Sequence, residues 1–166
     1  MAPVLRPGRP EDLPRLTEIY NHFVRTSGAT FDVVEQSVAL RQSWFDAHAA
    51  TGPHRLLVAE EAGAVLGWSS SGPLRPRPAY ARSVETSVYL DPSATGRGLG
   101  TLLGTALLDA LAAEDLHRAF AVVAVPNDAS EALHRRLGYR HVGTWSEAGY
   151  KLGRWWDVRW YERALP

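Results

Sequence analysis

The stretch that decides the fold is residues 84–108, VETSVYLDPSATGRGLGTLLGTALL. It begins with residues typical of a β-strand and passes through Asp91-Pro92, which is a turn signal. Glycines at positions 96, 98 and 100 then lead into leucines and alanines that predict a buried helix from Gly98 to about Ala113. A strand, a glycine loop and a helix in this order commonly seat a phosphate on helix N-terminal amides. The stretch therefore predicts a nucleotide-phosphate site within an α/β fold.

Three phosphate-binding motifs compete for this loop. The loop of P-loop nucleotide hydrolases ends in Gly-Lys-Ser/Thr, but the only lysine of the chain is Lys151. The dinucleotide fingerprint needs G-x-G-x-x-G, which the spacing of GRGLGT does not match. The pyrophosphate loop of coenzyme A acetyltransferases, [Q/R]-x-x-G-x-[G/A], fits at Gly98 and Gly100, with Thr95 in the first position. The alternative without a ligand is a glycine-rich turn that lets the helix pack tightly.

The rest of the chain alternates helical and strand patterns. Helices are predicted within residues 9–24, 35–53 and 127–139. Single strands are predicted near Val4 and within 81–92 and 119–126. Strand pairs are predicted within 54–72 and, rich in aromatic residues, within 149–165. Residues 73–80, PLRPRPAY, have too many prolines for a sheet and predict an extended loop. The order predicts one α/β domain over residues 1–166, with a mixed sheet of about seven strands and about four helices.

Composition excludes several classes of function. The 18 basic and 18 acidic residues give zero formal net charge, which disfavours binding to nucleic acid or an anionic membrane. The absence of cysteine excludes disulfides, thiolate metal sites and a cysteine acyl-enzyme, and the six histidines show no metal-ligand spacing. The sequence has no signal-peptide or membrane-spanning pattern, so we expect a cytoplasmic protein. The missing cysteines and the spacing of the histidines lead us to expect no bound metal.

Four separated segments carry a family resemblance. IYNHFVRTSGATFD (19–32), AYARSVETSVYLDPSATGRGLG (79–100), VPNDASEALHRRLGY (125–139) and AGYKLGRWWDV (148–158) together resemble the phosphinothricin N-acetyltransferase family of the GNAT superfamily. Relatives within it acetylate methionine sulfoximine or methionine sulfone. The resemblance implies a GNAT fold, acetyl-CoA as co-substrate and a homodimer. Thr95, Leu152 and Trp156 depart from the family pattern.

The resemblance implies a role for each matching position around acetyl-CoA. The backbone of Val88, Tyr89 and Leu90 would pair with the pantetheine arm, and Asn127 would contact the same molecule. The pyrophosphate would lie against Gly96, Arg97, Gly98, Leu99, Gly100 and Thr101. The amides of Gly98 and Gly100 suit this contact because glycine leaves the backbone accessible.

The resemblance also implies two catalytic side chains. Glu85 lies in an otherwise apolar and β-branched strand, where burial raises a carboxyl pKa and makes it a better base; an ion pair with Arg82 is the structural alternative. His134 lies beside the predicted core stripe Ala129, Leu133 and Leu137 of a helix, where a packed surface histidine is the alternative. Its ordinary pKa allows it either to assist deprotonation or to protonate the thiolate, and both roles stay open.

The acceptor is expected to be a small anionic amino-acid analogue. The family uses an aromatic residue matching Phe31, and the loop that here holds Arg75, Arg77 and Tyr80, around its substrate. Guanidinium groups suit carboxylate or phosphinate recognition, which disfavours a cationic polyamine. The resulting hypothesis is acetyl transfer to an α-amino group by direct attack. The alternatives are acylation of other amino acids or protein N-termini, or a non-catalytic acetyl-CoA sensor.

Overall fold

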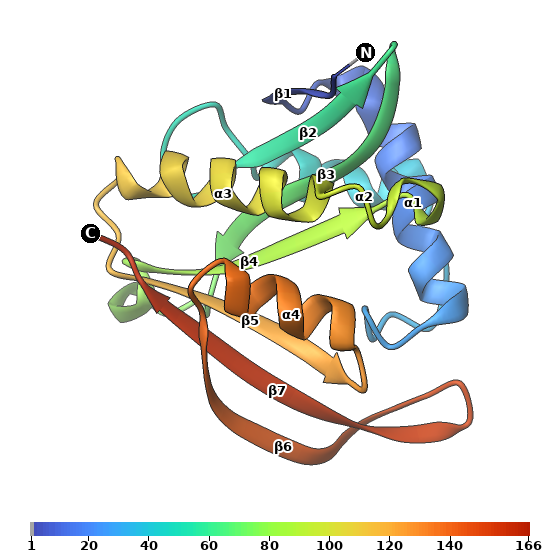
Figure 1. Ribbon diagram of the computed structural model, residues 1–166, viewed down its shortest axis with the longest axis vertical. Helices are drawn as coiled ribbons and strands as arrows, with labels where there is room; N and C mark the ends of the chain where they lie inside the picture. Colours follow the sequence, from blue (N-terminus) through green and yellow to red (C-terminus); the bar gives the residue numbers. More distant parts are fainter. Residues whose placement is uncertain (1) are drawn as a thin grey trace.

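The strand predicted before the glycine loop is β4 (Ser83–Leu90), which occupies the middle of a seven-stranded sheet (Figure 1). The computed structural model describes residues 2–166, and the sheet has the order β1-β2-β3-β4-β5-β7-β6. The pair β4 and β5 is parallel, whereas the other five pairs of neighbours are antiparallel. The predicted mixed sheet of seven strands with four helices is confirmed.

The remaining strands are β1 (Val4–Pro7), β2 (Leu56–Glu61), β3 (Ala64–Pro73), β5 (Arg118–Val125), β6 (Arg140–Lys151) and β7 (Arg154–Ala164). The helices are α1 (Leu13–Thr26), α2 (Val38–Asp46), α3 (Leu99–Ala112) and α4 (Asp128–Arg136), with short 3-10 turns at Pro10–Asp12, Pro78–Tyr80 and Pro92–Ala94.

Two apolar cores cover the two faces of the sheet. On one face the leucines of α3, including Leu107 and Leu111, pack on Val84 of β4 and Ala119 of β5. On the other face Leu16 and Ile19 of α1 pack on Val58 and Trp68 of β2 and β3. Because side chains alternate along a strand, Val84 and Thr86 of β4 point toward α3, and Glu85, Ser87 and Tyr89 point toward α1 and α2.

Three boundaries differ from the sequence predictions. The last hairpin is longer, because β6 begins at Arg140 rather than near Gly149, and irregularities at His141/Gly143 and Trp145/Gly149 interrupt its pairing with β7. Such irregularities and an exposed edge position obscure the alternating pattern on which a strand prediction depends. Pro73 is the last residue of β3 and pairs with Val84, so the proline-rich loop begins one residue later. The second helix is confined to Val38–Asp46.

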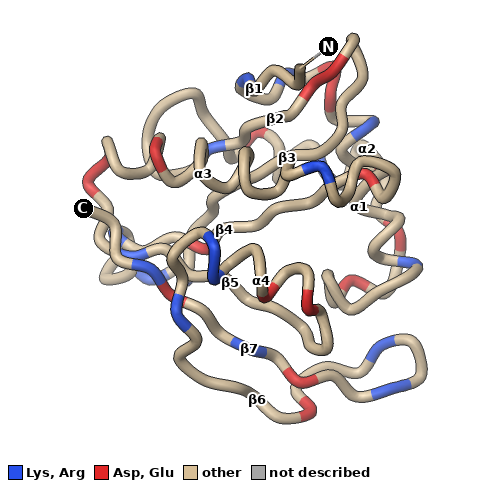
Figure 2. The backbone as a smooth tube through the Cα atoms, viewed as in Figure 1, with Lys and Arg blue, Asp and Glu red and all other residues tan. Residues whose placement is uncertain are grey.

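Charged residues of both signs are distributed over the elements (Figure 2). Of the helices described within residues 2–166, none combines the length and the apolar character needed to cross a membrane.

Candidate active site

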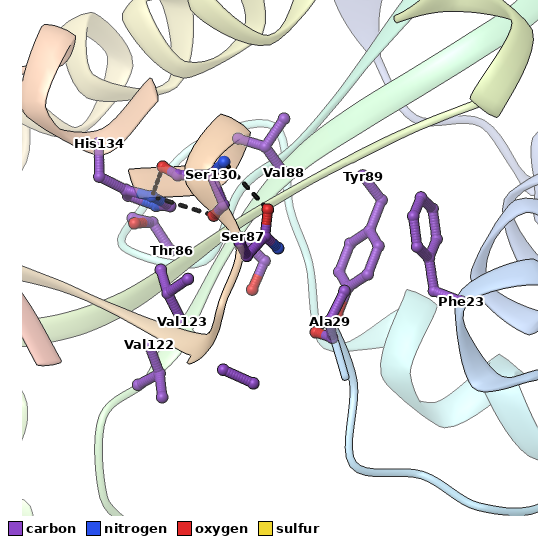
Figure 3. A pocket seen from close by; sticks show the side chains of 12 residues that line it. Phe23, Ala29, Thr86, Ser87, Val88, Tyr89, Val122, Val123, Ser130 and His134 are labelled. Atoms are coloured by element: carbon purple, nitrogen blue, oxygen red, sulfur yellow. Dashed lines mark hydrogen bonds between the residues drawn. The ribbon is translucent and has the colours of Figure 1, made fainter. Parts of the chain in front are cut away.

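The centre of the sheet opens where β4 and β5 separate. Their parallel pairing covers Ser83 with Arg118, Val84 with Ala119 and Glu85 with Phe120, and it ends there. Beyond this point a cavity of about 130 Å³ lies between residues 86–89 of β4 and residues 122–124 of β5. In Figure 3 His134 and Ser130 lie on one side of this cavity, and Tyr89 and Phe23 on the other.

The backbone of β4 directs hydrogen-bonding groups into this opening. The Asp91 N–H donates to Leu66 O and the His117 N–H donates to Arg82 O, both at 2.8 Å. This alternation turns the odd-numbered residues of β4 toward β3 and the even-numbered ones toward β5. The N–H and C=O groups of Val88 and Leu90 therefore face the gap, where an extended ligand can add to the sheet as another strand would.

The glycine loop contains glycines of two kinds. Gly96 and Gly98, with φ of 74° and 77°, need left-handed backbone, and a Cβ on either would meet no atom within 4 Å. They form an open turn whose last residue caps α3. Gly100 lies inside α3, where a Cβ would approach Cδ2 of Leu133 on α4 to 3.3 Å. Gly96 and Gly98 thus leave the backbone accessible to a ligand, as expected of the loop. Gly100 instead lets α3 pack closely against α4, which was the alternative without a ligand.

A cavity of about 410 Å³ lies between this loop and α4. Its lining brings together most of the residues predicted to hold acetyl-CoA: Val88, Leu90, Gly96, Gly98, Gly100 and Thr101, with Thr95 beside them. Arg136, which the sequence analysis missed, also lines it and donates to Thr101 Oγ1 at 3.3 Å. Its guanidinium adds positive charge beside the amides at the start of α3, which have no partner within the helix, and this combination fits a phosphate.

Four predicted cofactor residues contribute differently. The Arg97 side chain turns away to pair with Glu61 at 2.8 Å, and Leu99 is buried in the core, so both offer the loop their backbone. Tyr89 packs on the other face, where its hydroxyl donates to Ala29 O at 3.1 Å. Asn127 lines the cavity between the strands and caps α4, because its Oδ1 accepts from Ser130 N at 3.2 Å.

Glu85 is the last residue of β4 that pairs with β5, at the point where these two strands begin to separate. It lines two further cavities on the α1 and α2 face, one of about 220 Å³ and one of about 230 Å³. Burial raises the pKa of its carboxyl, and the nearby Arg75 opposes that shift. The alternative partner, Arg82, pairs instead with Asp115 at 2.7 Å. The surroundings of Glu85 suit a general base.

His134 is buried rather than at the surface, with 6% of its area exposed. Its ring stacks on Tyr161, and Nδ1 lies 2.7 Å from Ser130 O. A carbonyl only accepts, so Nδ1 carries the hydrogen and Nε2 is left with the lone pair in the neutral ring. Burial lowers the pKa of His134, which favours this neutral form.

α4 has only part of the predicted core stripe, because Leu137 is buried and Leu133 packs against the core whereas Ala129 does neither. Its buried face carries Glu131, His134 and Leu137, whereas Ala129 is exposed and lines the large cavity together with Leu133. A ligand cavity needs apolar walls as a core does, so the apolar pattern alone did not separate the two environments.

The predicted substrate residues divide into two groups. Phe31 lines the 220 Å³ cavity with Glu85 and packs against Gly149 of β6. Arg75 lies near enough to Glu85 to influence its pKa, with its guanidinium 5.3 Å from the Trp160 ring centroid. Arg77 and Tyr80 bracket the 3-10 turn Pro78–Tyr80 in the exposed loop between β3 and β4, and neither is among the residues lining the cavities described above.

Two further residues were missed. Ser87 lines the cavity between the strands and both cavities beside Glu85, so it lies where the three meet. Lys151 is buried, and its ammonium donates to Phe23 O at 3.1 Å and Thr30 O at 2.6 Å. It thereby fastens the loop that carries Phe31 to the tip of the β6–β7 hairpin. Within residues 2–166, no cluster of three or more His, Cys, Asp or Glu is arranged to hold a metal.

Comparisons with known proteins agree with this geometry. The profile of the acetyltransferase (GNAT) family matches residues 16–139. A phosphinothricin N-acetyltransferase of Streptomyces coelicolor is 55% identical over 97% of this chain and 95% of its own length. An L-methionine sulfoximine/L-methionine sulfone acetyltransferase of Pseudomonas paraeruginosa is 38% identical over 99% of this chain and 96% of its own.

A solved structure shows the same fold with the ligand expected here. The GNAT superfamily phosphinothricin acetyltransferase from Sinorhizobium meliloti, in complex with AcCoA, superposes with a TM-score of 0.94 at 34% identity, covering 99% of this chain and 89% of the other. With the matched profile and the curated relatives, this likeness establishes the fold and the enzyme class. The chain belongs to the acetyltransferase (GNAT) family.

Proposed function

We propose that this enzyme transfers acetyl from acetyl-CoA to the α-amino group of a small anionic amino-acid analogue of the phosphinothricin, methionine sulfoximine or methionine sulfone type. The observation that carries the proposal is the meeting of three cavities at Ser87, directly beside Glu85. A thioester entering between β4 and β5 and an amine held at Glu85 would come together at this point. The names of the relatives support the class of acceptor.

The residues present fit acetyl-CoA. The open turn at Gly96 and Gly98, the first amides of α3 and the Arg136 guanidinium suit its pyrophosphate. The free backbone groups of Val88 and Leu90 suit the amides of its pantetheine arm. When bound, acetyl-CoA supplies the activated acetyl group.

In the proposed reaction Glu85 takes a proton from the ammonium form of the acceptor. The neutral amine then attacks the thioester carbonyl carbon, a C–N bond forms, and the oxyanion accepts a hydrogen bond from the Val88 N–H. As the C–S bond breaks, the nitrogen would lose its second proton to give the N-acetyl product, and the departing thiolate would take up a proton and leave as free coenzyme A. Burial around Glu85 supports its role, because a raised pKa makes the carboxylate a stronger base.

We assign His134 to the base side of this reaction. Its bond from Nδ1 to Ser130 O and its lowered pKa both favour a neutral ring with a free Nε2 lone pair. Such a ring accepts a proton or a hydrogen bond and has no proton of its own to give to the thiolate from Nε2.

The acceptor's anionic group is proposed to meet Arg75, with Phe31 as an apolar wall. The proximity of Arg75 to Glu85 supports this arrangement, because an amino acid carries its ammonium and carboxylate a few bonds apart. Arg77 and Tyr80 remain proposed contacts from the same loop.

The wider biology is proposed from the same family membership. One sheet carries all seven strands, which supports a single acetyltransferase domain over residues 1–166. A homodimer is supported by exposed aromatic side chains on the edge hairpin β6–β7, among them Trp145, Tyr150 and Trp155. We place the enzyme in the cytoplasm, acting on a small molecule without metal, nucleic acid or membrane.

The decisive experiment measures release of coenzyme A thiol from acetyl-CoA with phosphinothricin, methionine sulfoximine, methionine sulfone, ordinary amino acids and a polyamine. The proposal expects turnover with the first three, and Glu85→Gln should lower kcat at least about 100-fold near neutral pH while acetyl-CoA affinity is retained. Acetyl-CoA binding without thiol release from any acceptor would instead indicate the sensor alternative. Near-wild-type rates for Glu85→Gln would overturn the assignment of the base.

A further inference from the structure

The proposed acceptor site continues past Glu85 toward α2. The 220 Å³ cavity with Phe31 lies toward β5, and the 230 Å³ cavity lies toward β3 and α2. Glu85 and Ser87 line both cavities. The two spaces therefore meet over the same two residues of β4, on the face of the sheet that α1 and α2 cover. An acceptor with its amine at Glu85 has room to extend in both directions.

From β3, Ser70, Ser71 and Gly72 of the segment GWSSSG line the second cavity. Antiparallel pairing places Gly72 directly opposite Glu85 and Ser70 directly opposite Ser87, so each pair shares one face of the sheet. Ser69 and Ser71 point to the other face, where their hydroxyls donate to Leu103 O and Pro53 O. Trp68, Ser70 and Gly72 thus share the face that α1 and α2 cover, and of these three Ser70 and Gly72 line the cavity.

Gly72 keeps the space opposite Glu85 open. A Cβ built on Gly72 meets no atom within 4 Å, and its backbone has the ordinary strand conformation that any residue adopts. A glycine within a strand is normally a disadvantage, because it packs nothing and loses more backbone entropy on folding. Neither the backbone conformation nor crowding by neighbouring atoms requires a glycine at position 72. The absence of a side chain here instead leaves an empty volume beside Glu85.

The walls of this cavity carry uncommitted polar groups. The His54 ring and the Ser70 hydroxyl line it, and within residues 2–166 neither group makes a hydrogen bond. His48, one helical turn after Trp44, uses Nδ1 on Trp44 O at 2.8 Å and keeps Nε2 free. The Trp44 ring supplies an apolar wall. A short aliphatic chain that ends in hydrogen-bond-accepting oxygens matches this lining.

Resting on the proposed function, we propose that the cavity of Gly72, Ser70 and His54 is the acceptor's side-chain subsite. It receives the aliphatic side chain of the amino acid, and Ser70 and His54 donate hydrogen bonds to the oxygens of its sulfone, sulfoximine or phosphinate head. Gly72, Ser70 and His54 then determine which amino acids are acetylated, whereas Glu85 acts on the amine that all of them share.

The first test fills the cavity. Gly72→Ala should fold at least as well as the wild type, because a Cβ at this position meets no atom within 4 Å, and Gly72→Val adds two carbons beside the open cavity. We expect kcat/KM for methionine sulfone to fall at least about 10-fold relative to kcat/KM for the short 2-aminobutyrate, with Val more severe than Ala. Gly143→Val is the matched control, because Gly143 lies in β6, outside these cavities, and also has no atom within 4 Å of a built Cβ. That control should leave the ratio unchanged.

The second test removes the donors. Ser70→Ala and His54→Leu should lower kcat/KM for methionine sulfone about 2- to 10-fold each, the usual cost of one hydrogen bond, while kcat/KM for methionine is maintained. His54→Gln should recover part of the loss, and His117→Leu, an exposed histidine before β5, should show none.

The outcomes separate the two levels of the proposal. A wild type that acetylates neither methionine sulfone nor the short acceptor overturns the proposed function, and the subsite with it. A wild type active on methionine sulfone whose acceptor ratio stays within about twofold in Gly72→Val overturns the subsite alone. Equal losses for methionine and its sulfone in Ser70→Ala and His54→Leu would overturn the hydrogen-bonding role.

Discussion

Among single residues, the interaction between Glu85 and Arg75 governs the proposed proton transfer. Burial raises the Glu85 pKa and Arg75 lowers it, and the base acts only when it is deprotonated. Removing the cation with Arg75→Gln should therefore raise the Glu85 pKa further and move the acidic limb of the kcat profile to higher pH. The measurement is kcat against pH at saturating acceptor. Arg77→Gln, in the same loop, is the control, and a limb that stays in place in Arg75→Gln contradicts the coupling.

Glu131 tests how the buried face of α4 is stabilised. It is 4% exposed and accepts from the Tyr161 hydroxyl and Arg159, both at 2.5 Å, and the hydrogen bond from Tyr161 is the main cause that lowers its pKa below the ordinary 4.5. Its carboxylate therefore stabilises the fold fully above about pH 4.5, and this contribution is lost as the pH falls through the lower folded-state pKa.

Glu131→Gln should lower the free energy of unfolding by about 2 kcal/mol at pH 7, measured by urea denaturation. The difference from the wild type should shrink as the pH drops below the folded-state pKa. Glu18→Gln, which loses an exposed ion pair with Arg15, should change stability by under about 1 kcal/mol. A pH-independent difference for Glu131→Gln would show that lost packing, not charge, is responsible.

Sequence motifs singled out Glu85 and His134 as candidate reactive side chains but did not reveal their surroundings. Glu85 and His134 were predicted from motifs, and burial shifts the pKa of both. The sequence patterns did not single out Arg41, although this residue is buried on α2. Its guanidinium lies 4.1 Å and 4.0 Å from the ring centroids of Tyr20 and Trp44, whereas Leu40 is exposed. Stacking on rings from two helices is a tertiary contact that no helical periodicity reveals.

Among elements, the β6–β7 turn contains an unfavourable residue. Leu152 and Gly153 have φ of 54° and 74°, the left-handed conformation of both central residues of a two-residue hairpin turn. Leucine adopts it at a cost, whereas asparagine tolerates it. Leu152→Asn should raise the free energy of unfolding by about 1 kcal/mol, measured by chemical denaturation.

The β2–β3 turn provides a parallel case for this turn. Ala62 has φ of 51° before Gly63 at 81°, so Ala62→Asn should also be stabilising. Tyr150→Asn, in the same hairpin but in extended strand, should give no gain. No gain from Leu152→Asn would mean that its side chain contributes contacts worth as much as the strain.

Lys151 connects the hairpin to the loop that carries Phe31. The basic tip of β6–β7 is visible in Figure 2, and from it the Lys151 ammonium reaches the carbonyls of Phe23 and Thr30. Trp156 supports the same loop, because its ring fills the space where a Cβ on Gly28 would lie. Lys151→Met should raise KM for the acceptor about 5- to 10-fold with little change in KM for acetyl-CoA, in steady-state kinetics.

Arg140→Met, an exposed change in the same strand, is the control for Lys151→Met. Equal rises in both KM values for Lys151→Met would point to general destabilisation rather than to misplacement of the acceptor loop.

The elements themselves followed largely from sequence, because apolar periodicity and glycine or proline signals mark most of them. The start of β6 did not, since its edge position leaves most of its residues exposed and two irregularities break its alternation. The Gly72 cavity was equally hidden. The sequence predicts only a strand pair over residues 54–72, and the relation of GWSSSG to Glu85 depends on a register between two strands that sequence does not specify.

For the whole molecule, the sheet is continuous in strand order yet is held across its middle by three residue pairs of β4 and β5. Beyond those pairs, α3 and α4 join the two halves on one face by packing Gly100 and Gly104 against Leu133 and Leu137, and Lys151 joins them on the other. The gap between β4 and β5 is therefore both the weakest part of the sheet pairing and the place proposed for the ligand. At this gap, the Val88 and Leu90 amides of β4 have no strand partner on the side that faces β5.

The unpaired edge of β4 has a consequence for hydrogen exchange. Amides of Val88 and Leu90 should exchange with solvent deuterium much faster than those of Ser87 and Tyr89, which bond to β3 in the same strand. Acetyl-CoA should slow the first pair selectively, and mass spectrometry of peptides covering β4 would record the change. Without acetyl-CoA, the β4 amides that face β5 would thus exchange freely beyond Glu85, although those that face β3 stay protected. The pantetheine arm would then protect them by accepting the hydrogen bonds that a neighbouring strand would otherwise accept.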